Sequence, residues 1–342
     1  MTEIFLTIFF ISVLLFFLGS GIWVALSMIG VSAIGMMLFT SRPVGDAMAT
    51  TIWGTSSSWT LTALPLFVWM GEILFRTRLS ENLFKGLSPW MQKLPGGLIH
   101  VNVVGCALFA AISGSSAATV ATVGKMSIPE LRKRKYPEKI LLGSLAGSGT
   151  LGLLIPPSII LIIYGVAVQE SIAKLFIAGI IPGIMIALIF MSYVIIWSLL
   201  NKKDMPKILE NFSFLEKIKR SKQLLPVILL ILAVIGSIYT GIATATEAAS
   251  LGVVGALVLS YFQKSLTVDT FKSSLLGATK TSCMIAFILA GSTFLSLAMG
   301  FTGLPRNLAV WIQNMDLSPY VLIFVLMIFY IILGMFLDGI SA

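Results

Sequence analysis

Two short runs of small and helix-breaking residues, each flanked by short apolar stretches, constrain this chain more than any other feature. The first is Ser-Gly-Ser-Ser-Ala-Ala-Thr at Ser113–Thr119, and the second is Gly147–Ser158, which contains two adjacent prolines. The apolar runs beside the first, 98–112 and 120–128, are each only about half a bilayer-spanning length, since crossing takes about 20 apolar residues. We therefore predict a re-entrant hairpin, 98–128, that enters and leaves on one side of the membrane.

The second run interrupts a helix that we place at 139–168. Pro156 and Pro157 remove two backbone N–H donors and disfavour helix at the residue before them, and three upstream glycines loosen the preceding turn. Backbone groups left unpaired at membrane depth are tolerated only where protein encloses them or a wet cavity lies beside them. Secondary transporters bind ions and anionic solutes at paired interruptions of this kind. The alternative is that the small residues serve close helix packing and the prolines only kink the helix.

The composition identifies the class of protein. Hydrophobic residues make up 57% of the 342 and charged residues 11%, and the mean hydropathy is +1.01. A soluble protein carries about 25% charged residues, so we expect an all-α polytopic membrane protein in contact with the lipid bilayer. Besides the hairpin and the interrupted helix, we predict spans at 4–18, 22–39, 58–76, 175–200, 224–240, 243–262 and 280–300.

The net charge of +9 reflects topology, because all but three of the 23 lysines and arginines fall in one set of loops. That set, with its immediate flanks, is 77–97, 129–138, 201–223 and 263–279. Basic loops face the cytoplasm, so the N-terminus is expected outside and the hairpin is expected to enter from the cytoplasm. The basic run at Arg132–Lys135 is a topology signal between membrane segments, and no nucleic-acid partner is expected.

Two further segments are predicted to lie at the membrane surface. Residues 78–97 mix charges with leucine, phenylalanine and tryptophan at helical spacing, which predicts an amphipathic helix in the interface. Residues 40–57 are polar and rich in serine and threonine, and Trp53 and Trp59 are placed to anchor the outer interface.

Residues that carry enzyme chemistry are scarce. His100 is the single histidine, and Cys106 and Cys283 both lie inside apolar runs. A histidine-based metal cluster is therefore excluded, and a membrane-embedded enzyme would lack a catalytic set. We expect no enzymatic activity and no resident cofactor. Glu247 is the most informative acid outside the hairpins: it is either a functional acid within a span or part of a helix cap with one of the two threonines before it.

A weak internal repeat runs through the chain at an offset of about 220 residues. Phe67–Gly71 corresponds to Phe287–Gly291, and the first hairpin tip, Ser113–Ala117, corresponds to Asp338–Ala342. An odd number of crossings between the matches makes the second copy inverted. An inverted repeat would continue with a second hairpin arm and a second broken helix, so we expect a truncated second copy. The predicted first repeat, basic cytoplasmic linker and incomplete second repeat are 1–200, 201–223 and 224–342.

These motifs resemble the large membrane (permease) subunit of tripartite ATP-independent periplasmic (TRAP) transporters, and the resemblance covers the whole chain. The matching segments are Gly114–Thr119 (GSSAAT), Ile128–Leu131 (IPEL), Ser148–Ser158 (SGTLGLLIPPS), Tyr164–Gly165 and Ala178–Gly183 (AGIIPG). The resemblance implies an inverted-repeat secondary transporter of the elevator type, with re-entrant hairpins and a broken helix, in the bacterial inner membrane with a periplasmic N-terminus.

The resemblance also implies a function and partners. The expected function is sodium-driven import of organic anions, such as C4-dicarboxylates, sialic acid or related carboxylates, with Na⁺ as the coupling ion. The expected partners are a small membrane subunit and a periplasmic substrate-binding protein. A related ion-coupled anion carrier that works without a binding protein would use the same architecture and is the alternative.

The site is expected at the hairpin tips and the broken helix. Sodium is a hard cation that favours oxygen ligands, and half-helix N-termini at Ser116 and Ser158 would present N–H groups to an anion. By the resemblance, Na⁺ is placed at Ser115, Ser116, Gly147 and Gly149. The full set of candidate sodium-binding and substrate-binding residues is Gly114, Ser115, Ser116, Thr119, Gly147, Gly149, Thr150, Pro156, Pro157, Ser158, Asp338, Gly339 and Ser341.

Overall fold

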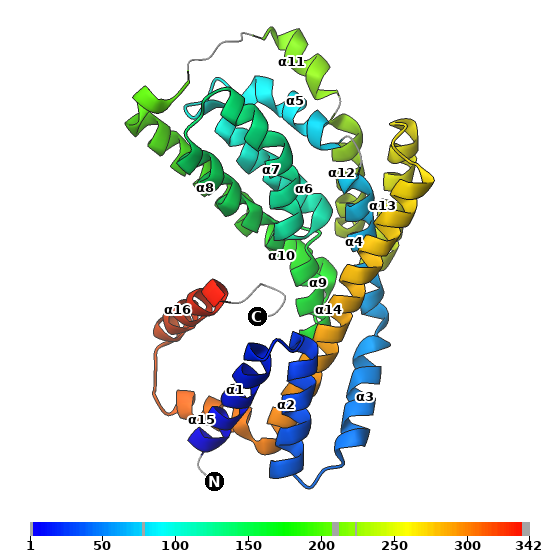
Figure 1. Ribbon diagram of the computed structural model, residues 1–342, viewed down its shortest axis with the longest axis vertical. Coiled ribbons are helices and arrows are strands. Elements are labelled where there is room, and N and C mark those ends of the chain that lie inside the picture. Colours follow the sequence, from blue (N-terminus) through cyan, green and yellow to red (C-terminus); the bar gives the residue numbers. More distant parts are fainter. Residues whose placement is uncertain (1–2, 77–78, 207–211, 223, 337–342) are drawn as a thin grey trace. The chain divides into compact units, whose positions relative to one another are not determined.

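The computed structural model describes residues 3–76, 79–206, 212–222 and 224–336, and this part of the chain is helical and without strands (Figure 1). The α-helices are α1 Glu3–Gly19, α2 Val24–Phe39, α3 Val44–Ser56, α4 Ala63–Phe75, α5 Leu79–Met91, α6 His100–Ser113, α7 Ser116–Lys133, α8 Glu138–Gly149, α9 Ile159–Val168, α10 Ile172–Leu200, α11 Phe214–Ser221, α12 Leu225–Tyr239, α13 Ala245–Phe262, α14 Val268–Thr302, α15 Leu304–Gln313 and α16 Pro319–Phe336. Short 3₁₀ segments lie at Trp59–Thr62 (η1), Gly97–Ile99 (η2), Thr150–Leu153 (η3) and Lys202–Asp204 (η4).

Several helices have the length and composition to cross a bilayer. Among the described residues, α10, α13 and α14 each qualify alone, and the number rises to five if two bent helix pairs each count as one span. Side chains on these helices are largely apolar and exposed in the isolated chain, as on α10, where Ile181 is 77% exposed. Such surfaces are expected where lipid is the solvent, so the fold agrees with a polytopic membrane protein.

The chain divides into two compact units, one formed by Met1–Trp59 with Cys283–Ala342 and the other by Thr60–Ser282. The second unit holds the hairpin and the broken helix together with α12 and α13, so the units cut across the predicted repeats. A repeat is a relation of sequence and need not coincide with a packing unit. The segments compared in the predicted repeat fall on α4–α5–α6 and on α14–α15–α16, in the same order. The inverted relation stays a prediction.

In the first unit, helices approach closely at small residues. Cβ atoms added at Gly30 and Gly35 would meet the rings of Phe17 and Phe10, so α2 packs directly on α1. A Cβ at Gly291 of α14 would lie 2.8 Å from the carbonyl oxygen of Ala25 in α2. Close approach at glycine is the usual way in which helices associate in a membrane, where the hydrophobic effect gives no driving force between them.

In the second unit, α6, α7 and α8 pack against one another, and α4 packs against α13 and α6 (Figure 1). The base of the hairpin is closed by Tyr136, whose hydroxyl accepts a hydrogen bond from the Leu98 N–H at 3.0 Å. A Cβ at Gly97 would lie 2.5 Å from that hydroxyl oxygen, which explains a glycine there. Burial raises the pKa of Tyr136 above its ordinary value, so its hydroxyl stays protonated at neutral pH.

Two segments predicted to lie outside the spans are helical. Residues 40–57, expected as a polar segment at the membrane surface, contain α3, which starts at Val44 and has Asp46 in its first turn, where an acidic side chain is favourable. The basic segment 263–279, expected as a loop, is helical from Val268, where α14 begins. The reason is that charged residues at one end of a long helix resemble a loop when only hydropathy is considered.

The linker 201–223 is also more structured than a polar connection. It contains η4 and the short helix α11, which has a capping box between Ser213 and Glu216. The predicted span 58–76 begins as the 3₁₀ segment η1 before α4, which itself has only 13 residues. The remaining predicted spans coincide with helices to within a few residues.

Candidate functional site

At the predicted hairpin tip, two helices are joined by a two-residue break. Helix α6 ends with Gly114 in the left-handed conformation at φ 57°, and the Gly114 N–H donates to the Ala110 carbonyl at 3.0 Å. Ser115 is extended and forms the N-cap of α7, with its hydroxyl accepting from the Ala118 N–H at 3.5 Å. The left-handed turn requires glycine because a Cβ there would be strained.

A pair of buried hydroxyls stabilises this tip. The Ser113 and Thr119 hydroxyl oxygens lie 2.8 Å apart and hydrogen bond across the break. The Ser113 hydroxyl also lies 3.3 Å from the carbonyl oxygen of Ser115. The Thr119 hydroxyl therefore already has a partner, and Ser113, which is absent from the predicted site, holds the geometry of the tip.

The second run also interrupts a helix. Helix α8 ends at Gly149, continues as η3 and gives way to an irregular segment that contains a cis peptide bond between Pro156 and Pro157. Helix α9 starts at Ile159. Ser158 is fully buried, and its hydroxyl donates to the Leu153 carbonyl at 2.6 Å, so it satisfies a carbonyl that the break leaves without a helical partner.

The hairpin tip and the broken helix lie directly against each other. The Ile159 N–H at the start of α9 donates to the Gly114 carbonyl at 3.3 Å. A Cβ at Gly114 would lie 2.8 Å from the Pro157 carbonyl oxygen, and a Cβ at Gly152 would lie 2.9 Å from the Ser115 carbonyl group. The two runs singled out by the sequence are thus in direct contact, and glycines allow their backbones to approach closely.

Other candidate residues stand in different surroundings. The carbonyl of Gly147 accepts from the Thr150 hydroxyl at 2.7 Å, and a Cβ at Gly147 would meet the Phe190 ring of α10 at 3.0 Å. Gly149, at the end of α8, packs on Val120 of α7. Of the two glycines in the predicted sodium set, Gly149 is therefore the one that lies beside the hairpin. Gly147 instead faces α10. The three candidates of the second tip lie outside the described residues: Asp338, Gly339 and Ser341.

Glycines of α10 support the break from the other side. A Cβ at Gly179 would lie 2.7 Å from the Leu154 carbonyl oxygen, and a Cβ at Gly183 would lie 2.8 Å from the Ile155 side chain. These two glycines belong to the Ala178–Gly183 motif, which therefore serves as a close-packing surface for the irregular segment.

A cavity of about 140 Å³ lies beside the tip, within the second unit. This volume holds several waters. The polar residues that line it are Ser113, Ser115, Thr281 and Glu72; the other lining residues are Val68, Gly71, Phe75, Ala118, Ala121 and Ile159. Sequence reasoning missed Thr281. Glu72 also forms an ion pair with Arg76, one helical turn on, at 3.1 Å.

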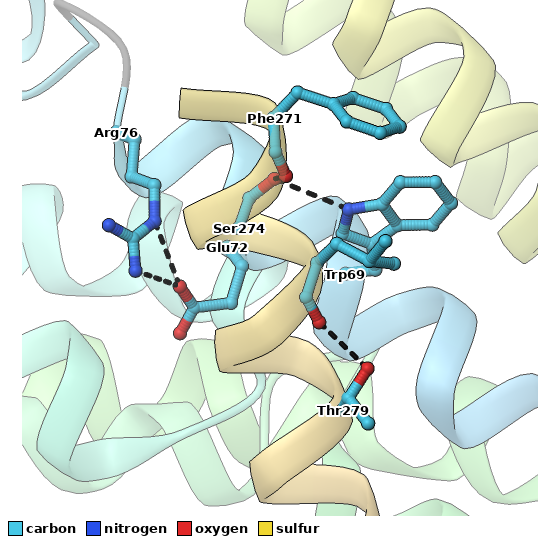
Figure 2. Close-up of polar contacts among 7 residues, drawn as sticks. Trp69, Glu72, Arg76, Phe271, Ser274 and Thr279 are labelled. Carbon is cyan, nitrogen blue, oxygen red and sulfur yellow. Dashed lines mark hydrogen bonds and ion pairs between the residues drawn. The ribbon is translucent and has the colours of Figure 1, made fainter. Parts of the chain in front are cut away.

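Contacts on both sides of α4 set the position of Glu72. Figure 2 shows the side toward α14, where the Trp69 indole N–H donates to the Ser274 hydroxyl at 3.3 Å. A Cβ at Gly277 would lie 2.8 Å from a carboxylate oxygen of Glu72. On the other side, a Cβ at Gly71 would lie 3.1 Å from the Ile112 carbonyl oxygen at the end of the first hairpin arm. An acid in a predicted span was the signal that could have marked this residue.

Glu247 has the capping role rather than a place in the site. Its carboxylate accepts from the Thr244 N–H and hydroxyl, both at 2.8 Å, and Thr244 accepts from the Glu247 N–H in return. This is a complete capping box at the start of α13. No group of three or more histidine, cysteine or acidic side chains that could hold a metal is found in the described part of the chain.

Comparison with known proteins identifies the family. Residues 9–342 match the family model described as "Tripartite ATP-independent periplasmic transporter, DctM component". The chain is 33% identical over 307 residues to the "C4-dicarboxylate TRAP transporter large permease protein DctM" of Pseudomonas aeruginosa, covering 90% of this chain and 71% of that protein. It is 32% identical to the "Sialic acid TRAP transporter large permease protein SiaM" of Vibrio cholerae, covering 94% and 75%.

A third relative is also a TRAP transporter permease protein. The "Isethionate TRAP transporter permease protein DctMQ" of Oleidesulfovibrio alaskensis is 29% identical, with 95% of this chain and 51% of the relative covered. The match to the family model over nearly the whole chain, together with identities above 30% to large permease proteins, leads to one conclusion. This chain belongs to the DctM-component family of tripartite ATP-independent periplasmic transporters.

Proposed function

We propose that this chain is the permease of a sodium-driven importer of organic anions in the bacterial inner membrane, with its N-terminus in the periplasm. The observation that carries the proposal is the direct contact between the hairpin tip and the broken helix, at Gly114–Ile159 and Ser115–Gly152. Paired interruptions of this kind supply unpaired carbonyls to a cation and helix N-termini to an anion. The names of the relatives cite C4-dicarboxylate, sialic acid and isethionate, which are organic anions.

Sodium binds at the tip in this proposal, with Ser115 and Ser116 as the principal ligands and Gly149 beside them. The Gly147 carbonyl accepts from both the hydroxyl and the backbone N–H of Thr150, so it stays in the proposed set as a ligand that would have to exchange one of these bonds for sodium. The free N–H groups of the first turn of α7 face the anion. The N-terminus of α9 contributes less in this conformation, because its Ile159 N–H is bonded to Gly114.

The proposed complex contains a small membrane subunit and a periplasmic substrate-binding protein. The DctMQ relative supports the first, since its name joins M and Q components in one permease protein. Family membership supports the second and disfavours a carrier without a binding protein. Reconstitution of the chain with and without each partner tests this directly: uptake should require all three, and uptake by the chain alone would contradict it.

Replacing Ser115 with alanine tests the sodium site. In the reconstituted transporter, loss of one ligand should raise the sodium concentration for half-maximal uptake by about 5- to 150-fold, which corresponds to about 1–3 kcal/mol for an unmet buried polar partner. Excess sodium should restore part of the rate, because ion and substrate binding are linked. If the residues serve only packing, sodium dependence should not change.

Ser127 offers a matched control on the same helix. It is buried in α7, away from the tip, and its hydroxyl has no hydrogen-bond partner among the residues that the structure describes. Ser127→Ala removes the same atom without removing an interaction, so it should leave both stability and sodium dependence unchanged. A similar rise in the sodium requirement in both variants would contradict a site at the tip.

A further inference from the structure

Helix α11, in the basic linker, has exposed apolar side chains on one face and several cations next to them. Phe214, Leu215 and Ile218 lie on one face at helical spacing and are 66%, 77% and 40% exposed. Four cations lie among and just after them, at Lys217, Lys219, Arg220 and Lys222, against one acid at Glu216. Three large apolar side chains on so short a charged helix are costly to leave in water.

This helix is fixed to α5 rather than free. The Trp90 indole N–H of α5 donates to the Ser221 hydroxyl at 2.8 Å, and that hydroxyl donates to the Gly86 carbonyl at 3.3 Å. The Phe214 ring meets the Trp90 ring edge-on at 6.1 Å, and the Lys217 ammonium lies 5.3 Å from the centre of the same ring. The contacts hold one edge of α11 on α5 and leave its apolar face uncovered by the described chain.

The place of α11 in the chain puts it next to a bilayer surface. It follows α10, a helix long and apolar enough to cross the membrane, and it ends at Ser221, shortly before the apolar helix α12 begins at Leu225. A segment between the ends of two apolar helices lies within reach of the phospholipid headgroups.

We propose that α11 is a docking surface for anionic phospholipid. Phe214, Leu215 and Ile218 enter the boundary between headgroups and acyl chains, and Lys217, Lys219 and Lys222 contact the phosphates around them. Lysine stems cover apolar surface while their ammonium groups remain at headgroup level. Clusters of four or more cations on an amphipathic helix favour anionic over zwitterionic lipid. A protein partner would not need this ring of like charge around an apolar centre.

The experiment uses the full chain in lipid nanodiscs, with Cys106 and Cys283 replaced by alanine and an environment-sensitive fluorophore on Leu215→Cys. In discs that contain phosphatidylglycerol, nitroxide-labelled lipid should quench the probe and aqueous acrylamide should not. In phosphatidylcholine discs, acrylamide should quench the probe more strongly than nitroxide-labelled lipid does. Salt at 1 M, where the screening length is about 3 Å, should weaken the lipid contact in the anionic discs.

Charge variants distinguish lipid recognition from a general surface position. Changing Lys217, Lys219 and Lys222 together to glutamine should abolish the difference between the two lipids, because each cation near an anionic surface contributes about fivefold to membrane affinity. The same three changed to arginine should retain it. Equal quenching in both lipids, or an unchanged response in the glutamine variant, would overturn the proposal. Shielding of the probe in detergent only when the small subunit is added would also overturn it, in favour of a protein partner.

Discussion

At the scale of single residues, Gly152 makes a tightly constrained contact between the two interrupted elements. A Cβ there would lie 2.9 Å from the Ser115 carbonyl group and 3.0 Å from the Ser116 nitrogen, and backbone atoms cannot move aside cheaply. Gly152→Ala should therefore separate the tip from the break and destabilise the protein by about 1–3 kcal/mol. Thermal unfolding in detergent and uptake both measure the effect. Gly143→Ala is the control: a Cβ at Gly143, in the middle of α8, meets nothing within 4 Å, so it should be neutral or slightly stabilising.

A second prediction at this scale concerns Glu72 and Arg76. Neutralising the acid and neutralising the base should affect the sodium requirement for uptake differently. Glu72 supplies the carboxylate in the wall of the cavity, and Arg76 is bonded to it at 3.1 Å. Glu72→Gln removes a negative charge near the proposed cation, so the sodium concentration for half-maximal uptake should rise. Arg76→Gln removes a positive charge and should lower it or leave it unchanged. A rise of equal size in both variants would indicate that the pair acts only as a structural contact, which for partly exposed ions is worth little.

At the scale of elements, substitutions at the N-terminus of α13 distinguish a structural role of Glu247 from a role in transport. The capping box between Thr244 and Glu247 predicts that Thr244→Ala lowers stability by about 1 kcal/mol without altering sodium dependence. Glu247→Gln keeps an acceptor for the Thr244 N–H and should be nearly silent in both assays. Loss of uptake in Glu247→Gln at normal stability would show that the acid lies on an ion path after all.

The same scale shows what sequence reasoning could and could not predict. Helix breaks were predictable, because Gly114 in a left-handed turn and the pair Pro156–Pro157 are residue types that end helices by local chemistry. The contact between the breaks was inferred only from the architecture of transporters, since local rules do not say which breaks meet. Glu72 could not be placed in the cavity, because its position depends on close approaches at Gly71 and Gly277, two glycines that resemble any others in the sequence.

At the scale of the whole molecule, topology is the testable property. All but three of the 23 basic residues fall on one predicted side, and the exceptions are Arg42, Lys174 and Arg306. A reporter fused at Lys203 should therefore be cytoplasmic, and one fused at Asp316 should be periplasmic. Activity of a periplasmic reporter at Lys203 would reverse the assignment. The division of the chain into two units does not affect this prediction of topology, because the distribution of basic residues indicates the side of the membrane on which a loop lies.

Sodium-driven uptake by this chain requires a cation bound at the hairpin tip, and protection of a cysteine in the cavity tests this most directly. Ala118 lies on α7 in the wall of the cavity and is partly exposed, so Ala118→Cys in a background without Cys106 and Cys283 places one reactive thiol there. We predict that a thiol reagent modifies this cysteine more slowly in sodium than in choline, and that Ser115→Ala raises the sodium concentration needed for protection. Equal modification rates in the two salts, in a transporter that still takes up its substrate, would contradict a sodium site at the tip.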